Sequence, residues 1–178
     1  MTPSQGLNYK RREKMRLFIA INFNEEIKDV LMDLADDLRE QGASGNFVPY
    51  DNLHLTLVFL GEVRDDELII IKDALDYVPF PDINIEINEC GNFRDLFWVG
   101  TKENKVLNEY VKKLRDYLRE DGINFDKKKF KPHITLIRRA NFPKGVIIKT
   151  PRVSMKCDKA SLMQTRFVKN KPVYLEIY

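Results

Sequence analysis

The 178 residues include only two histidines, two cysteines and one tryptophan. Cys90 and Cys157 stand alone, without a CxxC spacing, which argues against a cysteine-based zinc or redox motif and favours reduced thiols in a cytoplasmic protein. No apolar run approaches about 18 residues, so no membrane-spanning helix is expected, and the opening residues lack the apolar core of a signal peptide. A large excess of one charge is also missing. The net charge of +3 does not by itself indicate a nucleic-acid-binding protein.

Hydrophobic residues make up 43% and charged residues 32% of the chain, a profile typical of a soluble globular protein. A chain of this length is expected to form one domain with a sizeable core. Its first residues, MTPSQGLNYKRREK, are polar and basic. We therefore predict a flexible N-terminal extension over residues 1–14 and a single bilobal domain over residues 15–178.

Both histidines begin the same short pattern. His54 opens HLTL and His133 opens HITL, so each is followed by one variable residue, a threonine and a leucine. Each also lies 37 residues after a Leu-Phe pair, at 17–18 and 96–97. Between pair and histidine, apolar residues recur at spacings of three and four, which predicts helices over about 25–41 and 104–121. The chain therefore contains two copies of a strand, a helix and a histidine-bearing strand.

Two copies are too few for a solenoid, which needs at least three, so we expect two lobes related by a pseudo-twofold axis. Further patterns predict a helix over 65–77, a strand over 83–90, and strands near 152–164 and 173–177. The predicted fold class is α+β, with each lobe a largely antiparallel sheet that carries helices on its outer face. The active-site cleft is expected between the lobes.

The repeated pattern places polar groups together, because residues i and i+2 of a strand point to the same face. His54 and Thr56 should project together, as should His133 and Thr135. A single strand histidine is more often a surface or core residue than a catalyst, but two with one pattern on a polar face favour function. Two imidazoles on opposite sides of a phosphorus atom can serve as proton acceptor and proton donor, and threonine hydroxyls can donate hydrogen bonds to phosphate oxygens.

The doubled H-x-T-L pattern, about eighty residues apart, resembles the signature of the two-histidine phosphoesterase superfamily. The stretches MRLFIAINF, NLHLTLVFLGEV and FKPHITLIRR look most similar to its RNA 2′,3′-cyclic phosphodiesterase branch, first described as 2′-5′ RNA ligases. The resemblance runs from about Met15 to Tyr178. It implies a two-lobed α+β fold, no metal or other cofactor, and hydrolysis of RNA 2′,3′-cyclic phosphate ends to 2′-phosphomonoesters.

The resemblance also implies roles for single residues. The proton donor falls on His54 and the proton acceptor on His133. The phosphate-contacting residues fall on Thr56, Thr135 and Arg138.

The assignment of the arginine has an alternative. By strict alternation Arg138 faces away from His133, and Arg139 faces the cleft. A bulge or the end of the strand after Ile137 would turn Arg138 inward. Position in the family favours Arg138 and strand parity favours Arg139; we expect Arg138.

Residues near the two motifs are further candidates for contacts to a base or to the RNA backbone: Phe47, Phe130, Lys131 and Arg139. Aromatic side chains hold unpaired RNA by stacking, although a place in the core is the alternative for each of them. Lysines crowd just before His133, at 127–129 and 131, and form either a solvated loop or a phosphate-binding patch.

The implied partners are RNA ends or oligonucleotides, tRNA fragments among them, and no membrane; we expect a monomer. Two other functions stay open. One is a phosphodiesterase acting on small cyclic nucleotides or 2′-5′ oligoadenylates, and the other is a non-catalytic module that binds RNA ends. The chain has no GxxxxGK[ST] loop that would couple ATP to a ligase reaction.

Overall fold

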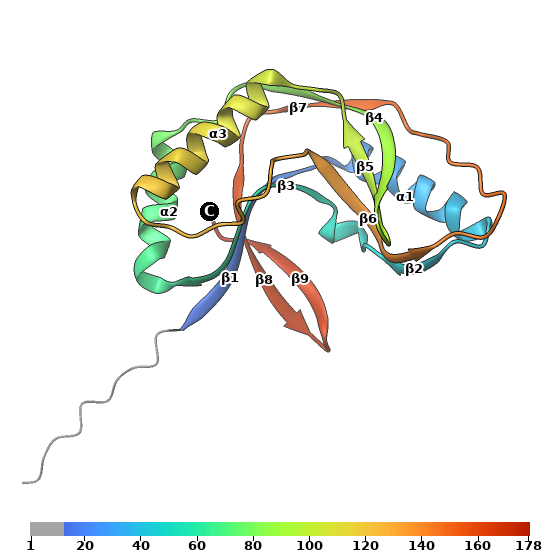
Figure 1. Cartoon of the computed structure of the whole chain (residues 1–178), viewed down its shortest axis with the longest axis horizontal. Coiled ribbons are helices and arrows are strands. Elements are labelled where there is room, and N and C mark those ends of the chain that lie inside the picture. Colours follow the sequence, from blue (N-terminus) through green and yellow to red (C-terminus); the bar gives the residue numbers. More distant parts are fainter. Residues whose placement is uncertain (1–12) are drawn as a thin grey trace, which may run out of the picture.

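The computed structural model describes residues 13–178 (Figure 1). Residues 1–12, most of the predicted extension, lie outside the described residues, and the first strand begins at Lys14, one residue before the predicted start. The elements in chain order are β1 (Lys14–Asn22), α1 (Glu25–Glu40), β2 (Ser44–Phe47), η1 (Tyr50–Asn52), β3 (His54–Arg64), α2 (Asp65–Tyr77), β4 (Ile83–Phe93), β5 (Leu96–Thr101), α3 (Lys105–Glu120), β6 (His133–Asn141), β7 (Val153–Cys157), β8 (Ser161–Val168) and β9 (Lys171–Glu176).

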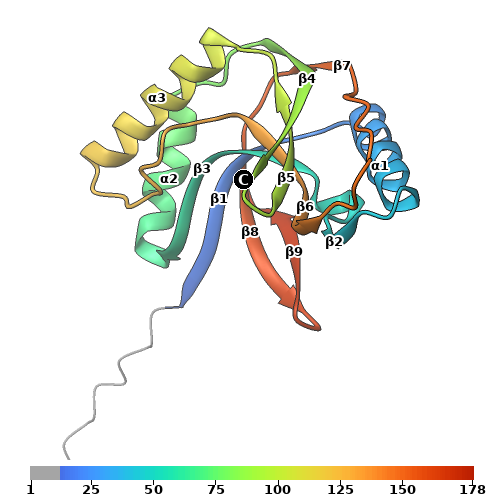
Figure 2. The same ribbon diagram turned by 45° about the vertical axis from the view of Figure 1, so that its right-hand side comes forward.

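The strands form two antiparallel sheets. Sheet A has the order β3-β1-β8-β9, and sheet B has the order β2-β6-β5-β4-β7. The two sheets correspond strand for strand, with β3 matching β6 and β1 matching β5, and β2 is added at the edge beside β6. The hairpin of β8 and β9 extends beyond the rest of sheet A (Figure 2). This architecture confirms the predicted α+β class with two pseudo-symmetric lobes.

The helices cross between the lobes. Helix α1, from the first sequence copy, packs against β6 and β7 of sheet B, whereas α3, from the second copy, packs on α2 and against β3 of sheet A (Figures 1 and 2). Each histidine strand therefore lies in a sheet that is covered by the helix of the other copy. The two sequence copies are interleaved in space, so neither corresponds to one lobe.

The two repeated helices agree with the predicted ranges of about 25–41 and 104–121 to within one residue at each end. The side-chain oxygens of Asn24 and Asn104 accept the backbone N–H of Ile27 and Leu107 at 3.1 and 3.0 Å, which satisfies donors that the first turn leaves unpaired. Gly42 follows α1 with a φ of +92°, a conformation in which glycine carries no side-chain penalty.

The strand ladders correct part of the sequence alignment. Val58 of β3 lies opposite Ile19, and its counterpart Ile137 of β6 lies opposite Phe97. Ile19 is thus the structural equivalent of Phe97, and the predicted match between the two Leu-Phe pairs is wrong by one residue. Both histidine strands carry the same bulge, so the offset arises in the connection between the paired strands: 32 residues separate Asn22 from its ladder partner His54, and 33 separate Gly100 from its partner His133.

Other strands also differ from the prediction. β4 continues to Phe93, three residues beyond the prediction. The strand predicted near 152–164 is two strands, β7 in sheet B and β8 in sheet A, separated by residues 158–160. β2, with the sequence SGNF, was not predicted because it has no alternating apolar pattern; its pairing with β6 makes it a strand.

Candidate active site

Each histidine is the first residue of its strand, and each strand separates polar from apolar residues by alternation. His54, Thr56, His133 and Thr135 are partly exposed. The residues between and after them face the core and are buried: Leu55, Leu57, Ile134 and Leu136. The alternation expected from the sequence is therefore present in both strands.

A bulge follows the motif in β6. The ladder with β5 shifts between Thr135 and Ile137, and Leu136 and Ile137 are both fully buried. Because two successive residues face the core, the next residue, Arg138, returns to the face of the histidine and lines the same cavity. Arg139 has a φ of +51° and does not line this cavity.

The same bulge occurs in β3, where Leu57 and Val58 are both buried and the ladder with β1 shifts. Phe59 then faces the cavity at the position that Arg138 has in β6. The guanidinium carbon of Arg16, from β1, lies 5.3 Å from the centroid of the Phe59 ring. The two halves of the site thus share backbone geometry and a histidine and threonine, but the residue after the bulge is Arg138 in β6 and Phe59 in β3.

Both histidines and both threonines line one cavity of about 870 Å³, which we call the central cavity. Sheets A and B both contribute to its lining. The charged side chains in this lining are six cations, Arg16, Arg115, Lys128, Lys129, Lys131 and Arg138, and one carboxylate, Asp126. Such an excess of positive charge within a concave site attracts anionic ligands.

The two imidazoles are held in the same way. The Nδ1 atoms of His54 and His133 lie 2.7 Å from the backbone carbonyl oxygens of Asn52 and Lys131, respectively. Since a carbonyl only accepts, each Nδ1 donates its proton, and the neutral ring carries its lone pair on Nε2. The Nε2 of His54 lies 3.0 Å from the Thr56 hydroxyl oxygen. In both residues Nε2 is therefore the atom available for proton transfer.

The surroundings of His54 are apolar. The rings of Phe18 and Tyr174 lie 4.8 and 5.1 Å from its ring, centroid to centroid. Burial is the main cause that lowers the pKa of His54 from 6.5 to about 4, and the charges of Arg138 and His133 lower it further, against the opposing effect of the Asn52 carbonyl. His54 is consequently neutral at pH 7 in the ligand-free protein.

His133 lies among different groups. The ring of Phe93 makes an edge contact with it at 5.2 Å, and Trp98 lies at 6.5 Å. The amine of Lys131 stands 4.6 Å from the Trp98 ring and 4.9 Å from the Phe93 ring, while its carbonyl holds the imidazole. Gly91, opposite Trp98 in the β4–β5 ladder, leaves room for the indole, because a Cβ there would collide with it.

Of the four remaining candidates from the sequence, two line the central cavity and two do not. Phe130 and Lys131 line the central cavity, whereas Phe47 and Arg139 do not. Phe47 lies on β2, partly buried against the core, with the Arg39 guanidinium 4.2 Å above its ring. Several further residues line the cavity although no sequence motif marks them: Arg16, Phe59, Phe93 and Arg115. Alternation along RLFIA places Arg16 on the face of Phe18, but that pattern alone does not reveal which face borders the cavity.

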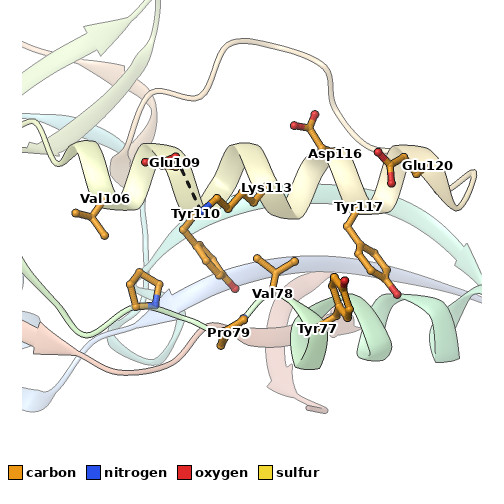
Figure 3. A pocket seen from close by; sticks show the side chains of 11 residues that line it. Tyr77, Val78, Pro79, Val106, Glu109, Tyr110, Lys113, Asp116, Tyr117 and Glu120 are labelled. Atoms are coloured by element: carbon orange, nitrogen blue, oxygen red, sulfur yellow. Dashed lines mark ion pairs between the residues drawn. The ribbon is translucent and has the colours of Figure 1, made fainter.

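A second hollow of about 470 Å³ lies beside α2 and α3 (Figure 3). Its charged lining residues are Glu109, Asp116, Glu120 and a single lysine, Lys113, whose amine lies 4.0 Å from a Glu109 oxygen. This mostly acidic lining disfavours a phosphate, and neither histidine is present. The central cavity is therefore the candidate active site.

Within residues 13–178, no group of three or more histidine, cysteine, aspartate or glutamate side chains is placed to hold a metal ion. None of the helices in that range is long and apolar enough to cross a membrane.

Comparison with known proteins gives consistent matches over most of the chain. The family model described as LigT like Phosphoesterase matches residues 21–96 and 99–174, one segment for each sequence copy. The chain is 30% identical over 176 residues to the RNA 2′,3′-cyclic phosphodiesterase of Thermotoga maritima, covering 92% of this chain and 94% of the relative. It is 33% identical over 135 residues to the protein of the same name from Archaeoglobus fulgidus, covering 71% and 75%.

Solved structures agree with this comparison. The crystal structure of E. coli LigT complexed with 3′-AMP superposes with a TM-score of 0.80 at 27% identity, covering 93% of this chain and 96% of the other. The protein TT0787 of Thermus thermophilus superposes with a TM-score of 0.81 at 26% identity, covering 92% and 96%.

Proposed function

The chain belongs to the LigT-like phosphoesterase family, and from this membership we propose that it hydrolyses RNA 2′,3′-cyclic phosphate ends to 2′-phosphomonoesters. The observation that carries the proposal is the central cavity, in which two His-x-Thr pairs from two sheets meet with Arg138. Relatives bear the name RNA 2′,3′-cyclic phosphodiesterase, and the similar E. coli LigT binds 3′-AMP, a nucleoside monophosphate. Both facts support a substrate that ends in a ribonucleotide phosphate.

The two Nε2 atoms perform the proton transfers of this reaction, because each Nδ1 is engaged by a backbone carbonyl. A water molecule attacks the phosphorus atom opposite the leaving oxygen, since displacement at phosphorus is roughly in line. His133 takes a proton from the water as its oxygen bonds to phosphorus. His54 donates a proton to the ribose O3′ as the P–O3′ bond breaks, which leaves a 2′-phosphate.

Charge on the non-bridging oxygens is stabilised by the remaining groups of the site. Thr56 and Thr135 follow the histidines at i+2 and share their face, and the β6 bulge brings Arg138 beside them. Two hydroxyls can donate hydrogen bonds to the oxygens, and a guanidinium can donate two at once. These donors stand in a cavity before the reaction begins, so they need little reorganisation when charge develops.

The low pKa of His54 couples its protonation to substrate binding. A donor must carry a proton, yet burial and nearby positive charge hold the His54 pKa at about 4 in the free protein. A bound phosphodiester brings a negative charge between the imidazole and Arg138, and a nearby negative charge raises the pKa of a histidine. The substrate itself thus promotes formation of the imidazolium that completes the reaction.

The proposal is tested by product analysis with a nucleoside 2′,3′-cyclic phosphate and with oligonucleotides that end in one. Phosphorus NMR against authentic 2′- and 3′-nucleotides should identify the 2′-phosphomonoester as the product. A predominantly 3′-phosphate product would reverse the assigned roles or the substrate orientation. Turnover only of 3′,5′-cyclic nucleotides or 2′-5′ oligoadenylates in the same panel would replace the proposed substrate, and binding without any product would indicate a non-catalytic module.

A further inference from the structure

The two halves of the central cavity differ in one pair of residues. The matching bulges place Arg138 on β6 and Phe59 on β3 in equivalent positions, so the arginine of the phosphate site has no counterpart in sheet A. Sheet A instead supplies Arg16 from the neighbouring strand β1, with its guanidinium over the Phe59 ring. Each sheet thus contributes one arginine to the cavity, but from different strands.

Arg16 stands too far along its strand to hold the same phosphate as Thr56. Thr56 lies opposite Ala20 in the ladder, and Arg16 is four residues from Ala20, on the order of 13 Å at the usual rise of a strand. Arg16, Phe18 and Ala20 alternate with core residues and share one face, which also bears His54. Arg16 therefore points to the same cavity at a separate position.

The Arg16 guanidinium is accessible to a ligand because no neighbouring acidic side chain in the described part of the chain pairs with it. Its ladder neighbour on β3 is Glu62, which lines a different hollow together with Lys14 and Arg64. Among the residues that the structure describes, no carboxylate forms an ion pair with Arg16, and its guanidinium lies over the Phe59 ring. A guanidinium stacked on an aromatic ring keeps its planar edge free to donate two hydrogen bonds to a phosphate.

Aromatic groups continue along the same face of sheet A. Thr165 of β8 lies opposite Arg16 on one side and opposite Tyr174 on the other. Two residues further along β8, on the same face, Phe167 is 64% exposed. Phe59 and Tyr174 on this face are partly exposed, and a cation among accessible aromatic side chains is the composition with which proteins hold single-stranded RNA by stacking and backbone contacts.

We propose that Arg16 and Phe59 form a second subsite, in which Arg16 binds the first phosphodiester upstream of the cyclic-phosphate end and Phe59 stacks on the base of the attached nucleotide. The inference rests on the proposed function and names its substrate class. The protein acts on oligoribonucleotides of two or more nucleotides in preference to a nucleoside cyclic phosphate. The RNA chain then leaves the cavity across sheet A and not across the lysine-rich segment at residues 127–131.

The test compares kcat/KM for a nucleoside 2′,3′-cyclic phosphate with that for the di- and trinucleotide that end in the same group. The wild-type protein should prefer the dinucleotide by about tenfold or more, since stacking of one base is worth ~1–3 kcal/mol. The variants Arg16→Gln and Phe59→Ala should each lower this preference severalfold. For the dinucleotide, the slope of log KM against the logarithm of the salt concentration should be smaller by about 0.7 in Arg16→Gln, the value expected for loss of one phosphate contact to a single strand.

Two control variants remove the same charge elsewhere. Arg166 lies on β8 beside Thr165 but on the opposite face, where its Nε donates to the Gln164 side-chain oxygen at 3.2 Å; Arg166→Gln should keep the wild-type preference. Lys129→Gln tests the other exit of the cavity. If Lys129→Gln abolishes the preference for the dinucleotide and Arg16→Gln does not, the second subsite lies beside the lysine-rich segment at residues 127–131 and the proposal is wrong.

The outcomes also separate the two proposals. If no cyclic phosphate is hydrolysed, the proposed function fails. If the nucleoside cyclic phosphate is hydrolysed as efficiently as the dinucleotide, or if Arg16→Gln slows both substrates equally, the proposed function stands and the second subsite is wrong. Partial recovery of the preference in Arg16→Lys, which restores the charge without the planar fork, would support a direct phosphate contact.

Discussion

At the scale of single residues, the two histidines have identical backbone anchors and unequal surroundings. Both donate Nδ1–H to a carbonyl two residues earlier, but only the Nε2 of His54 also has a hydroxyl neighbour, that of Thr56, at 3.0 Å among the described residues. His54 is enclosed by Phe18 and Tyr174, and its pKa is lowered to about 4, whereas His133 lies against Phe93 and Trp98. The repeated motif thus gives both rings the same backbone anchor, while the packing around each ring differs.

The His54 pKa should rise when an anion occupies the site. In the free protein its titration, followed by NMR of the ring protons, should be centred near the value of about 4 set by burial. With inorganic phosphate bound, the added negative charge favours the imidazolium, so the midpoint should move upward. The Arg138→Gln variant serves as a comparison, because loss of its charge alone should also raise the midpoint. An unchanged or lower midpoint with phosphate bound would contradict the coupling.

The same pKa makes a prediction about stability. The folded-state pKa of His54 lies below the unfolded value of about 6.5, so between these values the unfolded chain binds more protons than the folded one. The stability that the neutral ring contributes is complete above about pH 6.5 and is lost as the pH falls toward 4. His54→Asn retains a donor for the Asn52 carbonyl but cannot titrate. Thermal unfolding of this variant should be less sensitive to pH in that window, and equal pH dependence of the two proteins would refute the assignment.

Removal of either imidazole should slow turnover strongly. His54→Ala and His133→Ala are each expected to lower kcat by roughly 10²- to 10⁴-fold, the usual scale of general acid–base catalysis. Because the two groups act in one step, the double variant should lose much less than the product of the single effects. Steady-state assays with a nucleoside 2′,3′-cyclic phosphate measure this. Turnover near the wild-type rate in His54→Ala would exclude the paired mechanism.

At the scale of elements, β4 and β5 support the second half of the site. Gly91 of β4 lies opposite Trp98 of β5, and the indole packs near His133 and beneath the Lys131 amine. Gly100, the ladder partner of His133, also approaches the indole closely. Small residues on both sides of one large ring thus determine where the imidazole and the amine stand.

Gly91→Ala should displace Trp98 and impair the site. The new Cβ would overlap the indole, so we expect a lower kcat together with altered fluorescence of this single tryptophan. Gly122→Ala is the matched control: it has a φ of +75° with no atom within 4 Å of the added carbon. Its backbone strain should cost about 1 kcal/mol of stability and leave kcat and fluorescence as in the wild type. Wild-type kcat in Gly91→Ala would show that Trp98 does not position the site.

At the scale of the whole molecule, the crossing helices join the two lobes into one cooperative structure. α1 leaves the sheet of β1 and covers β6 and β7, while α2 and α3 cover β3. Sheet A also takes β8 and β9 from the far end of the sequence. Neither sequence copy can bury its own apolar surfaces, and both histidines depend on both copies for their supporting strands and helices.

Division of the chain in the loop between α2 and β4 should therefore abolish folding of the separate parts. Fragments 1–80 and 81–178 are each expected to lack a cooperative thermal transition in circular dichroism, while the intact chain unfolds in a single transition. A mixture of the two fragments should recover part of the native signal. A cooperative transition in fragment 81–178 alone would mean that sheet B does not need α1.

Turnover should also be independent of divalent metals. The two histidines are both assigned to proton transfer, and within residues 13–178 no cluster of three potential ligands surrounds them, whereas a catalytic zinc site uses three protein ligands. Activity should persist after treatment with EDTA. Loss of turnover that a divalent ion restores would overturn the mechanism proposed above.

Features that depend on neighbours a few residues apart could be predicted from the amino-acid sequence. Strand alternation placed each threonine on the face of its histidine, and apolar spacing indicated α1, whose ends are capped by Asn24 and Gly42. The doubled motif also indicated two related lobes and the chemistry of a phosphoesterase. These signals are local because side-chain direction and capping follow from the backbone geometry of single strands and turns.

Features that depend on pairing between distant segments became visible with the three-dimensional fold. The fold shows that a bulge after Thr135 turns Arg138 into the cavity, that α1 covers the sheet of the other copy, and that Arg16 packs on Phe59 beside the site. Alternation along one strand cannot reveal an inserted residue, and periodicity along one helix cannot reveal its partner. Both are set by which core contacts form between residues far apart in the chain.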